Sequence, residues 1–294
     1  MIKFEIKDGV AIIPEGTTVI GRGAFQDCTS LKSITIPESV NEIESYAFDG
    51  CTSLKNIIIS EEVIRIRHCT FRGCTSLQSI TIPASVTMIG NEDEEGCSLF
   101  AGCTSLKNIV VAAGNPVYDS REDCNAIIKT KTNNLLYGCK STIVPKSVKW
   151  IGAGAFSDCA SLKRIVIPKG VEGIDCEAFS GCSSLKSVTI PDSVTWIGPD
   201  AFAGCTSLKS ITIPESVTEI KNSVFERCIS LESITLPKSI TEIHAYAFNE
   251  CTALTAIYVP AKKADYYKER LPEELHDKIV ELAPEKKTKT EKEC

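Results

Sequence analysis

The sequence predicts a mainly β solenoid of stacked coils of about 23 residues, because two kinds of residue recur at that spacing. A Cys-x-x-Leu string marks one position of the coil and begins at Cys28, Cys51, Cys74, Cys103, Cys159, Cys182, Cys205, Cys228 and Cys251. Nine of the ten phenylalanines mark a second position, namely Phe25, Phe48, Phe71, Phe100, Phe156, Phe179, Phe202, Phe225 and Phe248. Equivalent residues should lie about 4.8 Å apart, the spacing of neighbouring strands, so we expect the phenylalanines to form one continuous ladder.

The coil that starts at Cys205 shows how one repeat should fold. Residues 208–213 end in an alternation of apolar and polar side chains, which is typical of a short strand with one buried face. Pro214 ends this strand because proline has no N–H group to offer the sheet. Val217 and Ile220 then turn the chain back along the core, and a phenylalanine closes the coil.

One coil of this kind is too small to fold alone. Burial of each large apolar side chain stabilises the coil by about 1.5–3 kcal/mol. Ordering the backbone costs about 1–2 kcal/mol for every residue, which outweighs the burial. Stacked neighbours supply the missing burial and the inter-strand hydrogen bonds, so stability should depend on contacts between adjacent coils.

The two ends of the chain depart from the repeat. We expect an N-terminal cap and half-repeat over residues 1–27, and the repeats themselves over residues 28–260. Residues 261–283 switch to a helical composition, which predicts a helical cap over the last coil. Residues 284–294 are charged, and we expect them to be disordered.

An insert at about residues 112–142 interrupts the repeats, and its two apolar stretches around a polar turn predict a β-hairpin. Cys124 and Cys139 bracket this hairpin. They would face each other, within reach of a disulfide, if the turn were Lys131-Thr132, but not if it were Asn133-Asn134, which is the chemically favoured turn. The sequence leaves this disulfide open, and we expect one hydrophobic core to continue through the insert.

The repeated pattern Cys-x-Ser-Leu-x-x-Ile-x-Ile-Pro-x-Ser-Val-x-x-Ile-x-x-x-Ala-Phe resembles the BspA-like leucine-rich repeats of bacterial surface proteins, over roughly residues 10–260. This resemblance implies a leucine-rich repeat solenoid, a right-handed curved coil with a parallel sheet on its concave side. It also implies a role in adhesion or in binding host proteins. Hairpin inserts similar to the one described above also occur in that family.

Composition and motifs argue against several classes of function. The net charge of -6 leaves no basic surface for nucleic acid, and no apolar run approaches the roughly 20 residues of a membrane span. His68, His244 and His276 are far apart in the repeat, so we expect no shared metal site and no Cys-His dyad. No phosphate-binding glycine loop or Gly-x-Ser-x-Gly elbow is present. The sequence therefore predicts a protein that is no enzyme and has no cofactor or metal.

Acidic residues and cysteines allow two further interpretations. Residues 90–99 contain four consecutive acids, which suggests a calcium loop, but they lack the ligand spacing of an EF-hand, and we interpret them as a solvated bulge.

Fifteen cysteines would suit a secreted disulfide scaffold. The repeat register alone explains nine of them, however, and we expect those thiols to be buried and reduced.

The N-terminus bears on the location of the protein. Residues 1–9 alternate apolar and charged side chains and contain no apolar region of the kind that signal peptides have. We therefore expect the chain as written to be cytoplasmic. If an export signal was removed, we expect it at the cell surface or secreted.

The candidate binding residues form a column, since they occupy one position in successive coils, just before the isoleucine at which the chain turns back, which is Ile220 in the coil from Cys205. They are Glu42, Arg65, Met88, Trp150, Gly173, Trp196, Glu219 and Glu242. Because the column accepts both charges, we expect it to face solvent. Trp150 and Trp196 should lie about 9–10 Å apart, flanking a gap at Gly173 that could receive an apolar side chain or a sugar ring. Met88 could extend this patch if the hairpin does not cover it. Alternatively, each indole packs against its neighbours or under the hairpin.

These observations favour a monomeric, non-enzymatic scaffold that binds a protein or glycan partner, of the bacterial adhesin or host-interaction type. The alternative is a cytoplasmic structural or assembly module with an intracellular protein partner. The resemblance favours the first hypothesis, and the absence of a signal peptide favours the second. The tryptophan column is the first expected contact surface, and the flat, nearly neutral face of the strands, rich in serine and threonine, is the next.

Overall fold

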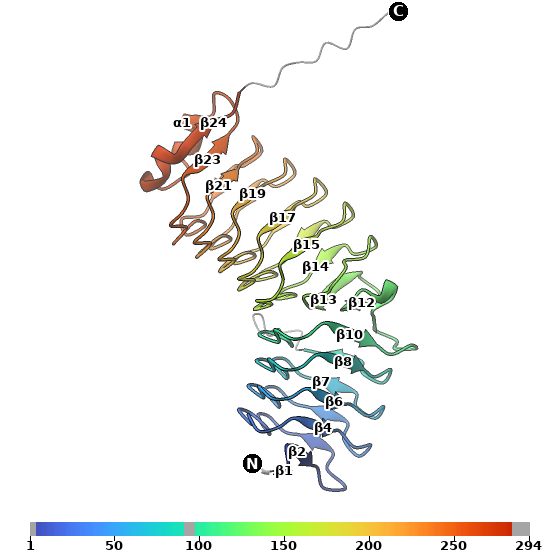
Figure 1. Cartoon of the computed structure of the whole chain (residues 1–294). Coiled ribbons are helices and arrows are strands. Elements are labelled where there is room, and N and C mark those ends of the chain that lie inside the picture. Colours follow the sequence, from blue (N-terminus) through green and yellow to red (C-terminus); the bar gives the residue numbers. More distant parts are fainter. Residues whose placement is uncertain (1–3, 91–97, 284–294) are drawn as a thin grey trace, which may run out of the picture.

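The computed structural model describes residues 4–90 and 98–283, which form a solenoid of parallel strands stacked coil upon coil (Figure 1). A regular coil contributes one short strand to each of two ladders. The first ladder contains β2 (Val10–Ile12), β4 (Ser33–Thr35), β6 (Asn56–Ile58), β8 (Ser79–Ile82), β10 (Asn108–Val111), β15 (Arg164–Val166), β17 (Ser187–Thr189), β19 (Ser210–Thr212), β21 (Ser233–Thr235) and β23 (Ala256–Val259). The second contains β3 (Val19–Ile20), β5 (Glu42–Ile43), β7 (Arg65–Ile66), β9 (Met88–Ile89), β14 (Trp150–Ile151), β16 (Gly173–Ile174), β18 (Trp196–Ile197), β20 (Glu219–Ile220) and β22 (Glu242–Ile243).

The solenoid and its parallel main strands confirm the predicted fold class. The second ladder is an addition to the predicted fold, because the sequence predicts only a return of the chain where these two-residue strands lie. At the N-terminus, β1 (Glu5–Lys7) pairs antiparallel with β2 and covers the first coil. The expected acidic bulge at residues 90–99 lies largely outside the described residues. The expected disordered tail at residues 284–294 lies wholly outside them.

Strands pair in register in both ladders. In the first ladder Ser210 pairs with Ser233, and in the second Glu219 pairs with Glu242. Ile211 of β19 is buried whereas Ser210 is exposed, because successive side chains of a strand point to opposite faces. Equivalent residues of neighbouring regular coils therefore lie side by side on the same face of the solenoid.

The phenylalanine rings stack in two separate runs. Neighbouring centroids from Phe25 to Phe100 lie 5.2–5.9 Å apart, and Phe4 extends that run at 4.9 Å. Neighbouring centroids from Phe156 to Phe248 lie 5.1–5.8 Å apart. The expected continuous ladder is wrong at the insert, where Phe100 meets Tyr137 edge to face. Phe156 packs instead on Gly138, where any side chain would collide with its ring.

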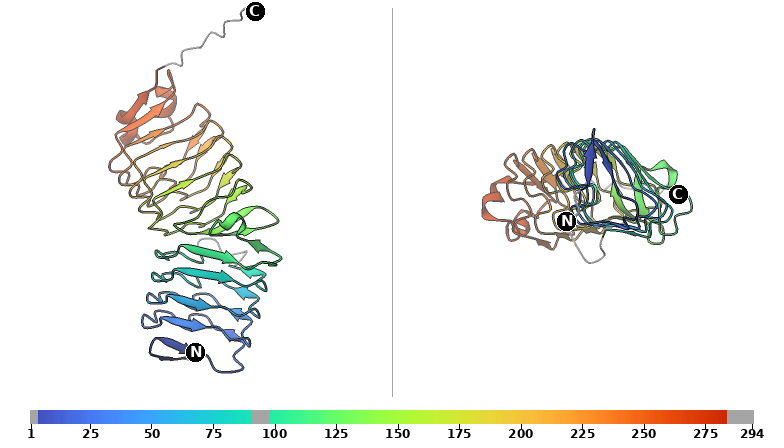
Figure 2. Two further views of the ribbon diagram at one scale, coloured as in Figure 1. Left: turned by 45° about the vertical axis from the view of Figure 1, so that its right-hand side comes forward. Right: turned by 90° about the horizontal axis from the view of Figure 1, so that it is seen from below.

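The insert forms the predicted hairpin from β12 (Ala126–Lys129) and β13 (Asn134–Gly138). Before it come β11 (Tyr118–Asp119) and the 3-10 helix η1 (Arg121–Asp123). The hairpin lies between the blue-to-teal and the green-to-red coils (Figure 2).

The core consists of two hydrophobic clusters, one on each side of this hairpin. Ile127 of β12 belongs to the N-terminal cluster, whereas Ala126 and Ile128 belong to the C-terminal cluster. The expectation of one shared core is therefore wrong, because alternate side chains of a strand that is buried on both faces enter different clusters.

No disulfide joins Cys124 and Cys139, and both are free thiols. The turn is centred on Lys131-Thr132, which alone would place the two cysteines opposite each other. A register shift between Ile127 and Ile128 moves the pairing by one residue. Cys139 Sγ instead donates a hydrogen bond to the Asn125 carbonyl oxygen, 3.5 Å away.

The last coil is covered by α1 (Ala264–Lys268) and the 3-10 helix η2 (Glu273–Lys278), which confirm the helical cap. Tyr267 and Leu275 extend the C-terminal hydrophobic cluster. The helical composition predicts the wrong structure at β24 (Ile279–Glu281), which is a strand that pairs parallel to β23. It can pair there because the last strand of a ladder has a free edge. No helix among the described residues has the length and apolar character needed to cross a membrane.

Candidate functional site

The exposed face of the first ladder is mostly serine, threonine and asparagine, but it also carries large aliphatic side chains such as Ile58 and Val110, and the two most exposed ones lie beside the hairpin. Ile143 is 71% exposed and Val166 of β15 is 79% exposed. Both line one cleft, which has a volume of about 570 Å³ and which we call the seam cleft. Its lining residues are Thr142, Ile143, Val144, Lys146, Arg164, Ile165, Val166, Pro168, Lys169 and Gly170.

The seam cleft forms because the coil before β15 is short. Pro145 lies 6 positions after Cys139, whereas in a regular coil Pro214 lies 9 positions after Cys205. Residues 139–145 of the shortened coil form no strand at this level. Within the described chain, β15 therefore pairs with β17 alone, and its other edge faces the cleft.

The seam cleft combines an apolar lining with positive charge. Lys146, Arg164 and Lys169 line it together with five aliphatic or proline side chains, and no aspartate or glutamate does. No ion pair connects these three cations to another described residue. The cleft is therefore complementary to a ligand that is both apolar and acidic.

Trp150 and Trp196 lie on β14 and β18, with β16 between them in one sheet. The expected gap between the indoles is absent, because the half-buried Trp150 lies over Gly173, where a Cβ would collide with its ring. Trp196 is 37% exposed, and Lys221 Nζ lies 4.8 Å from its ring centroid. Met88 is equally exposed, but it lies on β9 at the edge of a different sheet. The structure thus brings the tryptophans into one sheet without Met88.

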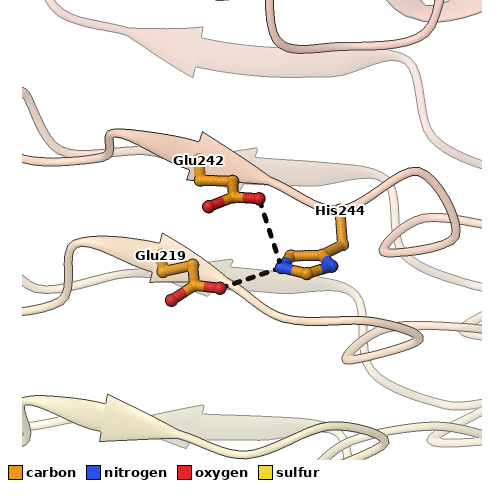
Figure 3. Close-up of side chains that lie close together, drawn as sticks. All are labelled: Glu219, Glu242 and His244. Carbon is orange, nitrogen blue, oxygen red and sulfur yellow. Dashed lines mark hydrogen bonds and ion pairs between the residues drawn. The ribbon is translucent and has the colours of Figure 1, made fainter.

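Beyond Trp196, two glutamates and a histidine of the second ladder come together (Figure 3). His244 Nε2 lies 2.8 Å from Glu219 Oε1 and 3.6 Å from Glu242 Oε1. Lys221 Nζ lies 2.5 Å from Glu219 Oε2. The hydrogen bond from Lys221, and then that from His244, lower the pKa of Glu219, which keeps this carboxylate ionised.

The sequence analysis does not predict this cluster, because the three histidines of the chain are far apart in the repeat. The signal that could have found it is a Glu-x-His string at Glu242 and His244, preceded one coil earlier by Glu219 in the same column. Among the described residues, these three have the spacing of metal ligands.

A serine–histidine pair elsewhere in the second ladder does not form an accessible site. Ser45 Oγ and His68 Nδ1 lie 3.1 Å apart, which is the pairing that serine hydrolases use to activate a nucleophile. Both residues are buried, with 9% and 6% of their surface exposed. The bond therefore connects two adjacent coils instead of presenting a hydroxyl to a substrate.

The family model for the BspA type leucine rich repeat region matches residues 10–120 and 128–266 in 6 copies. The chain belongs to the BspA-type leucine-rich repeat family. The short gap between the two matched ranges falls within the insert, where the BspA-type register is lost. No curated protein matches this sequence.

Solved structures of other proteins share the BspA-type fold. The chain is 31% identical to a leucine rich cell surface protein of Faecalibacterium prausnitzii A2-165, with a TM-score of 0.60, covering 83% of this chain but only 64% of that one. A leucine-rich repeat protein of Eubacterium ventriosum is 23% identical, with a TM-score of 0.67 and coverages of 85% and 72%. The pneumococcal vaccine antigen PcpA is 21% identical, with a TM-score of 0.63 and coverages of 86% and 68%. The last two show the fold alone.

Proposed function

We propose that this BspA-type protein is a non-enzymatic scaffold of the bacterial adhesin type, and that its seam cleft binds an extended, apolar and acidic segment of a protein partner. The observation that carries the proposal is the exposure of Ile143 and Val166 beside three cations that form no ion pair with another described residue. Large exposed aliphatic side chains that share one concave surface are typical of interaction sites. Similarity to a cell surface protein supports the adhesin type.

An extended peptide suits the cleft better than a sugar does. The lining contains aliphatic side chains and no aromatic ring, whereas the apolar face of a sugar packs well on an aromatic one. The edge of β15 that faces the cleft pairs with no described strand, so an added strand could form main-chain hydrogen bonds there. Lys146, Arg164 and Lys169 would attract carboxylates of the same segment.

Selection of peptides on the intact chain from an unbiased displayed library tests this proposal. We expect the selected peptides to combine aliphatic residues with aspartate or glutamate. Val166→Glu should weaken their binding at least about tenfold, because it places a carboxylate among the aliphatic side chains and repels acidic ligands. The matched control is Thr189→Glu, which changes the exposed residue of the same column on β17, outside the cleft, and should leave binding unchanged.

Equal binding to wild type and to Val166→Glu would show that the cleft is not the contact surface. Trp150, Trp196 and Met88 would then be the next proposed surface, tested with the Trp150→Ala, Trp196→Ala double variant. Binding to a glycan array with no selected peptide would refute a protein partner.

A further inference from the structure

We propose that Glu219, Glu242 and His244 bind a divalent transition-metal ion of the zinc class. The ligand atoms of the three residues all lie within 4.8 Å of one another, and they come from two adjacent coils that the fold holds side by side (Figure 3). This site is separate from the seam cleft. Its test therefore stands apart from that of the proposed function.

The three groups have the chemistry and spacing that such an ion needs. Imidazole nitrogen and carboxylate oxygen are common zinc ligands. With bonds of about 2.1 Å in a tetrahedral site, the ligand atoms lie about 3.4 Å apart. The separations of His244 Nε2 from Glu219 Oε1 and Glu242 Oε1, 2.8 and 3.6 Å, lie on either side of this value. All three ligand atoms lie within 4.8 Å of one another, so rotation of the glutamate side chains would bring them around the ion.

The cluster is open to solvent. The side chain of His244 is 37% exposed and that of Glu242 is 65% exposed, so an ion can enter without unfolding. Water can also occupy the fourth position of the coordination shell, as it does in zinc sites with three protein ligands. Lys221 binds the other oxygen of Glu219, Oε2, which leaves Oε1 directed towards His244.

The same place in the N-terminal coils provides an internal comparison. Glu42 of β5 pairs with Arg65 of β7, as Glu219 of β20 pairs with Glu242 of β22. Arg67 Nε lies 2.7 Å from Glu42 Oε1, which is the same coil-to-coil bond that His244 makes to Glu219. In the N-terminal coils, the position that corresponds to His244 is therefore occupied by Arg67. Its permanently charged guanidinium forms an ion pair with Glu42.

The C-terminal coils differ from this arrangement at two positions, and both changes introduce a metal ligand. Glu242 replaces a column arginine, and His244 replaces the arginine that bridges the coils. Glu219 and Glu242 then face each other on paired strands, and like charges placed directly opposite destabilise a sheet. A divalent cation held by both carboxylates and by the imidazole nitrogen would remove this repulsion.

Titration of the intact chain with Co²⁺ and Zn²⁺ at about pH 7.5, where an ordinary histidine is neutral, tests the site. Cobalt absorption reports the ligand types, and calorimetry reports zinc affinity and stoichiometry. We expect one site with nitrogen and oxygen ligands and no thiolate-to-cobalt band. His244→Arg should lower zinc affinity at least about tenfold, since it removes a ligand and recreates the bond of Arg67 to Glu42.

Two further variants make the result specific. Glu219→Gln should also lower zinc affinity at least about tenfold, whereas Glu42→Gln, the matched change at the equivalent position of the N-terminal coils, should leave it unchanged. Zinc should raise the melting temperature of the wild type but not of His244→Arg, whose fold circular dichroism would verify. Absence of binding, equal affinity of wild type and folded His244→Arg, or a spectrum with thiolate ligands only would overturn the proposal.

Discussion

Individual cysteines show why one residue type recurs at the start of each coil. Cys205 Sγ donates a hydrogen bond to the Phe179 carbonyl oxygen at 3.3 Å, and Cys228 Sγ donates one to the Phe202 carbonyl oxygen at 3.2 Å. Cysteine is small and apolar enough for the core, and its thiol also satisfies a carbonyl group of the preceding coil. Cys205 and Cys228 are buried as predicted, and the structure adds the hydrogen bond, whereas the expectation is wrong for the ladder cysteine Cys28, which is only partly buried.

We expect these thiols to react slowly with an alkylating reagent in the folded protein. Burial raises the pKa of Cys205 to about 12 and that of Cys182 well above its ordinary value, so little reactive thiolate forms near neutral pH. Cys28 and Cys176 are only partly buried and should be modified earlier. Mass spectrometry after timed native alkylation measures the order. Rapid modification of Cys182 and Cys205 would contradict the prediction; Cys294, expected to react first, lies outside the described residues.

The two phenylalanine runs stabilise whole elements, because each ring contacts the equivalent ring above and below it. The strands themselves contain only two to four residues in either ladder, which is too short for independent stability. Their order therefore depends on the stacked side chains that join one coil to the next.

Phe202→Ala should lower the free energy of unfolding by about 3–5 kcal/mol, as expected for a large-to-small change in a core. Phe202 is fully buried, and its ring stacks on Phe179 at 5.3 Å and on Phe225 at 5.8 Å. Chemical denaturation measures the loss. The control Thr212→Ala, on the exposed face of β19, should change stability by less than about 0.5 kcal/mol. A loss below about 1 kcal/mol for Phe202→Ala would contradict a stabilising role of the stack.

The complete chain is two stacks of coils that meet at the hairpin. Each stack has its own hydrophobic cluster and its own run of phenylalanines. The stacks touch through β12, which is buried between them, and through polar bonds such as that from Ser161 Oγ to the Thr104 carbonyl oxygen at 2.6 Å. Alternate side chains of β12 enter the two different hydrophobic clusters, so the molecule has a natural boundary there.

We expect the two stacks to lose their protection against hydrogen exchange separately. Phe202→Ala should speed amide exchange mainly in the strands of the C-terminal stack, β15 to β23, because nearest-neighbour stability is lost there. The matched variant Phe48→Ala should act mainly on β2 to β10. Exchange detected by mass spectrometry on both variants measures this. Equal acceleration in both stacks would show that the hairpin couples them into one cooperative unit.

The repeat length, the buried columns and the hairpin could be predicted from the sequence, because stacked coils require the same side chain at the same place in every repeat. The cysteine and phenylalanine columns therefore specify the same local fold in every coil, because each coil carries the same pattern. The family followed from the same pattern, and the family model confirms it. The position of Trp150 and Trp196 in one solvent-facing column also followed from register.

The division of the core, the seam cleft and the Glu219–Glu242–His244 cluster required the three-dimensional structure. Each depends on which coil lies beside which across an irregular insert, and on the direction of individual side chains. Periodicity specifies the column of Gly173, but it does not show that the Trp150 indole turns to cover that glycine. Likewise, composition could not show that residues 279–281 would add a strand to β23, because the free edge of that strand exists only once the coils have stacked.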